Sequence, residues 1–242
     1  LGRAADYWNS VTSWESTGEF VAHAFTKHAL PMIWDYGEIN PIGGGGGSWE
    51  SAIGWVVRVI KNLPQGKGFV LQHNAMEPSK INNAVISTDP PYYDNVPYSN
   101  LSDFFYMWTR IALKGYFPDN FQTIQTPKKD ELIASHSLHD NIDDAMKFFS
   151  EGMTRALTCI NAETNPAVPI TLYYAFKQSD TSEAGTSSTG WESFLESVIK
   201  SGFSITGTWP IRTERASRGR AIGSNALASS VVLVCRKRKK SA

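Results

Sequence analysis

Residues Ala84-Val85-Ile86-Ser87-Thr88-Asp89-Pro90-Pro91-Tyr92 decide the fold of this 242-residue chain. The run at 84–87 is short, largely apolar and bounded by Asn and Pro, which is typical of a buried strand in an α/β sheet. Asp89 follows this run almost directly. Because ligands bind at the carboxyl ends of strands in open α/β sheets, we expect the Asp89 carboxylate to lie at a binding edge.

The segment Asp89-Pro90-Pro91-Tyr92, here called the proline corner, offers hydrogen-bond acceptors. Each proline has a fixed φ angle and no backbone N–H, so the corner is a stiff turn with a carboxylate and free carbonyls. An exocyclic amine has two protons, which Asp89 and the Pro90 carbonyl would accept. These acceptors would stabilise positive charge that develops on the amine nitrogen when it attacks a methyl donor. A purely structural turn is the alternative interpretation.

The aromatic ring of Tyr92 suits a nucleobase that has left the double helix. A base inside a duplex is out of reach, so an enzyme flips it out at a cost of a few kcal/mol. Stacking on an aromatic ring returns about 1–3 kcal/mol per base. We therefore expect Tyr92 to be the stacking surface for the target base.

Hydrophobic periodicity extends this pattern to the rest of the chain. It predicts helices at 12–28, 49–63, 101–113, 142–160 and 191–199, and strands at 69–71, 84–87, 168–176, 203–211 and 229–236. Thr12 and Glu15 have capping-box spacing for the first helix, and Ser48 is a good N-cap for the second. Because only a loop separates the last two strands, we expect them to pair antiparallel in an open α/β sheet.

Composition excludes several functional classes. Lys and Arg number 23 and Asp and Glu 23, and this zero net charge argues against coating nucleic acid by charge alone while permitting one basic face. Cys159 and Cys235 are far apart and form no CxxC, so we expect no metal site, no disulfide and a reducing, cytoplasmic compartment. No apolar run has membrane-spanning length, so no membrane partner is expected.

The sequence around the proline corner resembles a known family. The run TDPPYYDNVPYSNLSDFFYMWTR at 88–110 is similar to the large prokaryotic adenine-specific DNA methylases whose longer members carry a zinc ribbon. The resemblance continues at 209–214 and 229–234. It implies a Rossmann-like S-adenosylmethionine-dependent methyltransferase sheet with an antiparallel last strand, here incomplete, and transfer of a methyl group to adenine N6 in DNA by direct attack of a flipped base.

Residue roles carry over from the resemblance by position. Asp89, Pro90 and Tyr92 match the motif that grips the target amine, and Pro91 shapes the turn. The same run contains Tyr93, and also Asp94 and Tyr98, without an assigned role. S-adenosylmethionine is the implied methyl donor and DNA the implied partner. Methylation of cytosine N4 or guanine N2, including in RNA, and a catalytically incomplete nucleic-acid-binding fragment are the alternatives.

A run of glycines superficially resembles the family's cofactor loop. Asn40-Pro41-Ile42 precedes Gly43 to Gly47, but about forty residues separate this run from Asp89, whereas each βαβ unit takes about 30 residues. Residues 31–39 also make a poor buried strand. We therefore interpret the run as a linker, leave the cofactor-binding residues unassigned, and expect an upstream portion of the same protein to complete the pocket. The predicted division is 1–66, a helical segment with this linker, and 67–242, the catalytic region.

Four arginines form a second candidate site between the last two strands. Arg212, Arg215, Arg218 and Arg220 lie in a loop that Gly219 and Gly223 keep open. A basic loop at a sheet edge suits DNA phosphates. A solvated loop is the equal alternative.

Several other polar residues have two interpretations. A substrate-facing insertion is one interpretation of Lys128, Lys129, His136 and His139, and ordinary surface polarity is the preferred one. Asn74 follows an expected strand, where it would face the cofactor adenine or simply form a turn, and the turn is the preferred interpretation.

Overall fold

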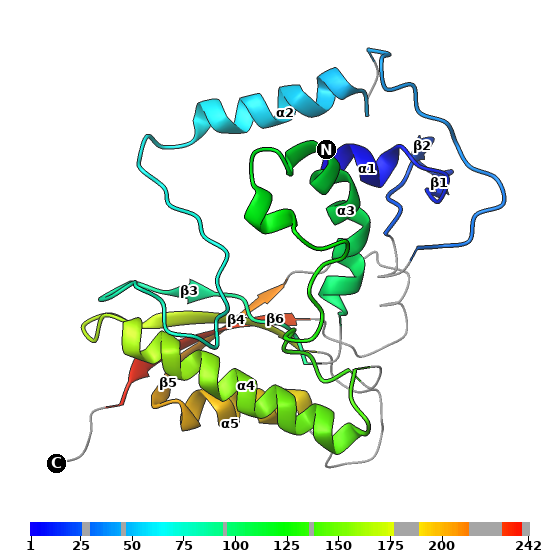
Figure 1. Cartoon of the computed structure of the whole chain (residues 1–242). Helices are drawn as coiled ribbons and strands as arrows, with labels where there is room; N and C mark the ends of the chain where they lie inside the picture. Colours follow the sequence, from blue (N-terminus) through cyan, green and yellow to red (C-terminus); the bar gives the residue numbers. More distant parts are fainter. Residues whose placement is uncertain are drawn as a thin grey trace. The chain divides into compact units, whose positions relative to one another are not determined.

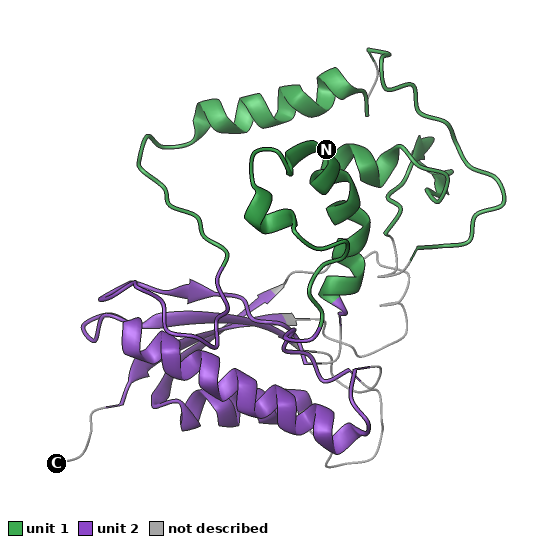
Figure 2. Ribbon diagram, in the orientation of Figure 1, with its two compact units in different colours: residues 1–72, 98–128 green, residues 73–97, 129–242 purple. Residues whose placement is uncertain are grey.

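The structure is a computed structural model that describes residues 1–25, 30–44, 47–93, 96–135, 138–176, 189–212 and 229–238. Two compact units make up the chain (Figure 2). The first contains residues 1–72 and 98–128, and the second contains residues 73–97 and 129–242. The functional division predicted after residue 66 stays a prediction.

The first unit is mainly helical (Figure 1). Its elements are α1 (Gly2–Tyr7), β1 (Trp14–Glu15), β2 (Phe20–Val21), α2 (Trp49–Asn62), α3 (Tyr98–Leu113) and the 3-10 helix η1 (Pro118–Phe121). Ser48 directly precedes α2, and its side chain accepts a hydrogen bond from the Ser51 amide at 3.2 Å, which confirms the predicted N-cap. α3 confirms the predicted helix and begins three residues earlier.

The predicted helix at 12–28 is wrong, because β1 and β2 form an antiparallel hairpin there. Trp14 pairs with Val21, and Glu15 with Phe20. The Thr12 hydroxyl donates to the Asn9 carbonyl instead of capping a helix, and the Glu15 carboxylate accepts from the Thr17 amide at the turn. Local side-chain bonds therefore outweigh the helical spacing. Residues 26–29 lie outside the described part.

The predicted strand at 69–71 is also wrong. These residues form no regular structure, and Phe69 and Val70 are 85% and 95% exposed. A short apolar run becomes a strand only where a neighbouring strand receives its backbone hydrogen bonds. Among the described residues this segment pairs with no strand.

The second unit contains a mixed α/β sheet. Its elements are β3 (Ser87–Thr88), α4 (Ile142–Glu163), β4 (Ile170–Phe176), α5 (Thr189–Lys200), β5 (Phe203–Arg212) and β6 (Ser229–Lys237). The strand order is β3-β4-β6-β5. β3 runs parallel to β4, whereas β6 runs antiparallel to both β4 and β5. Three strands therefore share one direction and the last strand opposes them, which confirms the predicted antiparallel pair.

The expected buried strand at 84–87 is shorter and more open than predicted. β3 begins only at Ser87, and Ala84 forms an isolated parallel bridge with Thr164. Between them Val85 is 75% exposed. The run extends the sheet at its edge, so the described strands cover it on one side only.

The core of the second unit lies between the sheet and the two helices α4 and α5, which pack against each other (Figure 1). Alternate residues of β4 point inward, as the period of a strand requires. The core side chains from α4, β4 and α5 include Phe149, Met153, Leu157, Ile170, Leu172, Tyr174, Phe194 and Val198. Asn141 caps α4 by accepting from the Asp144 amide at 2.9 Å.

Candidate functional site

The backbone of β3 places Asp89 at the carboxyl end of a parallel strand pair. Ser87 is opposite Thr171 and Thr88 opposite Leu172, and the two side chains of the first pair share a hydrogen bond of 2.8 Å. Asp89 follows at once and is exposed. Its predicted position at this edge of the sheet is therefore confirmed.

Tyr92 turns back onto Asp89. The Tyr92 hydroxyl donates a 2.7 Å hydrogen bond to Oδ1 of Asp89. Among the described residues Asp89 has no further hydrogen-bond or ion-pair partner, which leaves Oδ2 available to a ligand. Pro90 and Pro91 between them are half-buried and contribute no N–H donor. Among the described residues, one carboxylate oxygen of the proline corner thus accepts a hydrogen bond and the other does not.

The ring of Tyr92 is anchored in the core of the second unit. It meets Tyr174 of β4 edge-to-face, with ring centroids 5.5 Å apart and an interplanar angle of 73°. Tyr174 is buried and stacks in turn on Phe194 of α5, at 4.2 Å and 14°. The sequence identified Tyr92 but not these two supporting rings, because contacts across such sequence distances leave no local signal.

Tyr93, the residue after the proline corner, is also held in place by contacts with the core. Tyr93 packs edge-to-face on Phe149 of α4, and its carbonyl accepts from the Ala134 amide at 2.9 Å. Gly190 in the first turn of α5 lies against the same tyrosine. The sequence pointed to Tyr93 without a role and did not point to Gly190.

The first of the four arginines, Arg212, lies at the same edge of the sheet as Asp89. Because β5 runs parallel to β3, Arg212 at the carboxyl end of β5 belongs to that edge, where its backbone pairs with Ser229. Arg215, Arg218 and Arg220 lie outside the described residues. The basic site formed by these four arginines therefore stays a prediction.

Lys128, the first lysine of the predicted insertion, takes part in a hydrogen-bond network within the first unit. Lys128 Nζ lies 2.5 Å from Oδ2 of Asp103, whose Oδ1 accepts from both the amide and the hydroxyl of Thr126. Burial, the largest single effect, raises the pKa of Asp103, but the bonds from Lys128 and Thr126 together outweigh it and lower that pKa to about 2. Lys128 therefore anchors a loop to α3.

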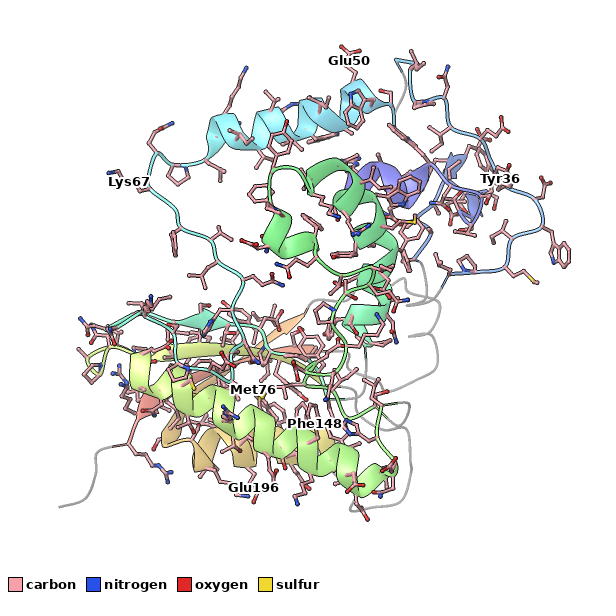
Figure 3. The ribbon with its side chains drawn as sticks, viewed as in Figure 1. Tyr36, Glu50, Lys67, Met76, Phe148 and Glu196 are labelled. Carbon is pink, nitrogen blue, oxygen red and sulfur yellow. The ribbon has the colours of Figure 1, made fainter. Side chains whose placement is uncertain are left out.

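Of the two histidines in the predicted insertion, the structure describes only His139. His139 packs on Phe148 of α4, labelled in Figure 3, with ring centroids 4.8 Å apart. His136 lies outside the described residues. The described part of the chain holds no group of three or more His, Cys, Asp or Glu side chains arranged for a metal ion.

Two residues weighed for the cofactor take part in turns. The Asn40 side chain accepts from the amides of Ile42 and Gly43, and coil rather than a strand precedes this glycine run. The Asn74 side chain accepts from the Met76 amide at 3.0 Å, which agrees with the preferred interpretation as a turn residue. The described residues thus present no glycine loop at the end of a parallel strand, and the cofactor-binding residues stay unassigned.

Both cysteines are free thiols. Burial raises the pKa of Cys235 on β6 to about 11, so this thiol is a packing residue rather than a nucleophile. In the part of the chain that the structure describes, every helix is too short or too polar to cross a bilayer.

Comparisons of the chain with protein-family models, with characterised proteins and with solved structures give no match. Functional inference therefore rests on the site itself.

Proposed function

We propose that the chain provides the amine-binding part of an S-adenosylmethionine-dependent methyltransferase that acts on N6 of adenine in DNA. The observation that carries this proposal is the pairing of Asp89 with Tyr92 at the carboxyl end of β3. An amine acceptor and an aromatic ring are held together there, at the edge where α/β sheets bind ligands. The resemblance of residues 88–110 adds the expected chemistry.

The acceptors of the corner would bind and orient the amine. Oδ2 of Asp89 accepts one N–H of the adenine amine, and the Pro90 carbonyl accepts the other. With both protons held, the nitrogen becomes tetrahedral and its lone pair is free for attack. The carboxylate also stabilises the positive charge that develops on nitrogen before a proton leaves. S-adenosylmethionine, when bound, would supply the methyl group and leave as S-adenosylhomocysteine, and the proton lost by the amine would pass to solvent.

Tyr92 would hold the flipped base. Its hydroxyl is fixed by Asp89 and its ring by Tyr174, so the ring is oriented before the base arrives. Such preorganisation lowers the entropic cost of placing two reactants together. Ring and carboxylate then act on one base as a unit.

The sheet supports the proposal in part. β6 is the last strand and opposes its neighbours, as the resemblance implies. The described residues before Gly43 form coil, which does not fit a cofactor loop at the end of a parallel strand. We therefore assign the cofactor pocket to another part of the protein. Calorimetry that gave micromolar S-adenosylmethionine affinity for these 242 residues alone would contradict that assignment.

The proposal is tested with the complete protein that the gene encodes. The protein is incubated with DNA or RNA and S-adenosylmethionine, and digested nucleosides are separated by mass spectrometry. We expect N6-methyladenine from DNA, lost in Asp89→Ala and kept in Asp140→Ala, an exposed acid of the same unit. Methylated cytosine, methylated guanine or methylated RNA would favour the alternative substrates. Methylation that persists in Asp89→Ala would remove Asp89 from the reaction.

A further inference from the structure

The residue that follows the proline corner has an uncommon backbone conformation. Tyr93 has a φ angle of 31°, in the left-handed region that a bulky L side chain rarely adopts. Such a conformation persists only where surrounding contacts enforce it, and it is found preferentially at functional sites. The contacts of Tyr93 therefore show what holds the corner.

Main chain and side chain of Tyr93 are both anchored in the core. The carbonyl accepts from the amide of Ala134, and the ring packs on Phe149 with centroids 5.1 Å apart and an interplanar angle of 82°. Both partners are buried. Tyr93 thus connects the corner to α4 and to the segment before it.

Gly190 of α5 supplies the space that Tyr93 occupies. A Cβ atom on Gly190 would lie 2.6 Å from Cγ of Tyr93 and 2.8 Å from its Cβ. Rotation of the Tyr93 side chain about χ1 leaves its Cβ in place, so this rotation cannot relieve the 2.8 Å overlap with that atom. Any side chain at 190 must therefore displace the Tyr93 backbone or α5.

α5 reaches the proline corner by two routes. Gly190 contacts Tyr93, and one turn later Phe194 stacks on Tyr174, whose ring meets Tyr92. Tyr92 in turn holds Asp89. Tyr92, the last residue of the proline corner, and Tyr93, the residue after it, are thereby both positioned by α5.

We propose that Gly190 and Tyr93 are positioning residues for the proline corner and its binding of the amine. This inference rests on the proposed function and identifies the two residues that set the geometry of the proline corner. The close approach at Gly190 fixes Tyr93, and Tyr93 fixes the direction in which the chain leaves Tyr92. Displacement of Tyr93 moves the Tyr92 hydroxyl away from Asp89 and loosens the grip on the amine.

The geometry is tested by hydrogen exchange measured by NMR. The Ala134 amide reports on its bond to Tyr93, and the Leu172 amide of β4 serves as reference. In Gly190→Ala we expect Ala134 to exchange at least about tenfold faster relative to Leu172. Val198→Ala removes a buried contact of the same helix and should leave that ratio unchanged. In a Tyr93→Ala background, Gly190→Ala should add no further change. A ratio unaffected by Gly190→Ala would overturn the proposal.

The positioning role of Gly190 is tested by how well the protein distinguishes a base with an exocyclic amine from one without it. Binding is compared between a single-stranded oligonucleotide that contains adenine and one that contains purine, which lacks the exocyclic amine. We expect wild type to prefer adenine, Val198→Ala to keep this preference and Gly190→Ala to reduce it about fivefold or more. Discrimination retained in Gly190→Ala would overturn the positioning role alone. Equal binding of both oligonucleotides by wild type would overturn the proposed function and this role with it.

Discussion

Oδ1 of Asp89 accepts a hydrogen bond from the hydroxyl of Tyr92, three residues along the chain, at 2.7 Å. The bond orients the carboxylate and commits one of its oxygens, while the same tyrosine ring is braced by Tyr174. The proposed acceptor for the amine and the proposed stacking surface for the base are therefore linked by a direct hydrogen bond. Removal of the bond should separate the two roles.

Tyr92→Phe should lower methyl transfer while base binding persists. A hydrogen bond to a charged group contributes about 1.5–3 kcal/mol, so we expect kcat of the complete protein to fall by about tenfold or more. KM for DNA should change little, because the ring remains. Tyr173→Phe on β4 is the control, since this tyrosine is exposed. A kcat equal to that of wild type would show that the hydroxyl does not orient Asp89.

Neutralisation of the arginine loop should flatten the salt dependence of DNA binding. If Arg212, Arg215, Arg218 and Arg220 contact phosphates of duplex DNA, glutamine at each should reduce the slope of log K against log salt by about 0.9 per lost contact. Removal of four exposed basic groups elsewhere is the control, with glutamine at Arg58, Lys61, Lys67 and Lys80. If the two variants had equal slopes of log K against log salt, the four arginines would not contact DNA phosphates.

Asp103 should stabilise the fold in a pH-dependent manner. Its pKa is lowered to about 2 in the folded chain against 3.8 for a free side chain, so its contribution is present above pH 4 and lost between pH 4 and 2. After screening by solvent we expect Asp103→Asn to reduce the free energy of unfolding by about 1–2 kcal/mol at pH 7.

The measurement for Asp103 is urea unfolding at several pH values. The difference between wild type and Asp103→Asn should shrink as the pH falls below 4 and become small at pH 2. Asp35→Asn, at an exposed position of the same unit, should cost little at any pH. A cost for Asp103→Asn that stays constant from pH 7 to pH 2 would mean that the carboxylate charge does not stabilise the loop.

Periodicity predicted the elements that pack on one another. α4, β4, α5, β5 and β6 follow the predicted ranges closely, because each buries one face in a shared core and their patterns record that burial. The prediction failed at 12–28, where Val21 and Ala24 are buried but Phe20 is 53% exposed, so the apolar residues do not form one buried helical face. It also failed at 69–71, where Val70 is 95% exposed and the apolar run does not reflect burial.

The candidate site was predicted as a set of residues rather than as a geometry. Asp89 and Tyr92 are close in sequence, and their chemistry was visible in the motif. The bond between them, the brace from Tyr174 and the space at Gly190 depend on side-chain directions and on contacts from distant strands and helices. Such contacts follow from the tertiary fold and have no local signature.

Recognition of the exocyclic amine is tested most directly by Asp89 itself. Binding of oligonucleotides that contain either adenine or amine-free purine is measured for wild type and Asp89→Ala. We predict that wild type prefers adenine by about 10-fold or more, the equivalent of one hydrogen bond to a charged group, and that Asp89→Ala binds both alike. A preference for adenine that survives in Asp89→Ala would contradict the account.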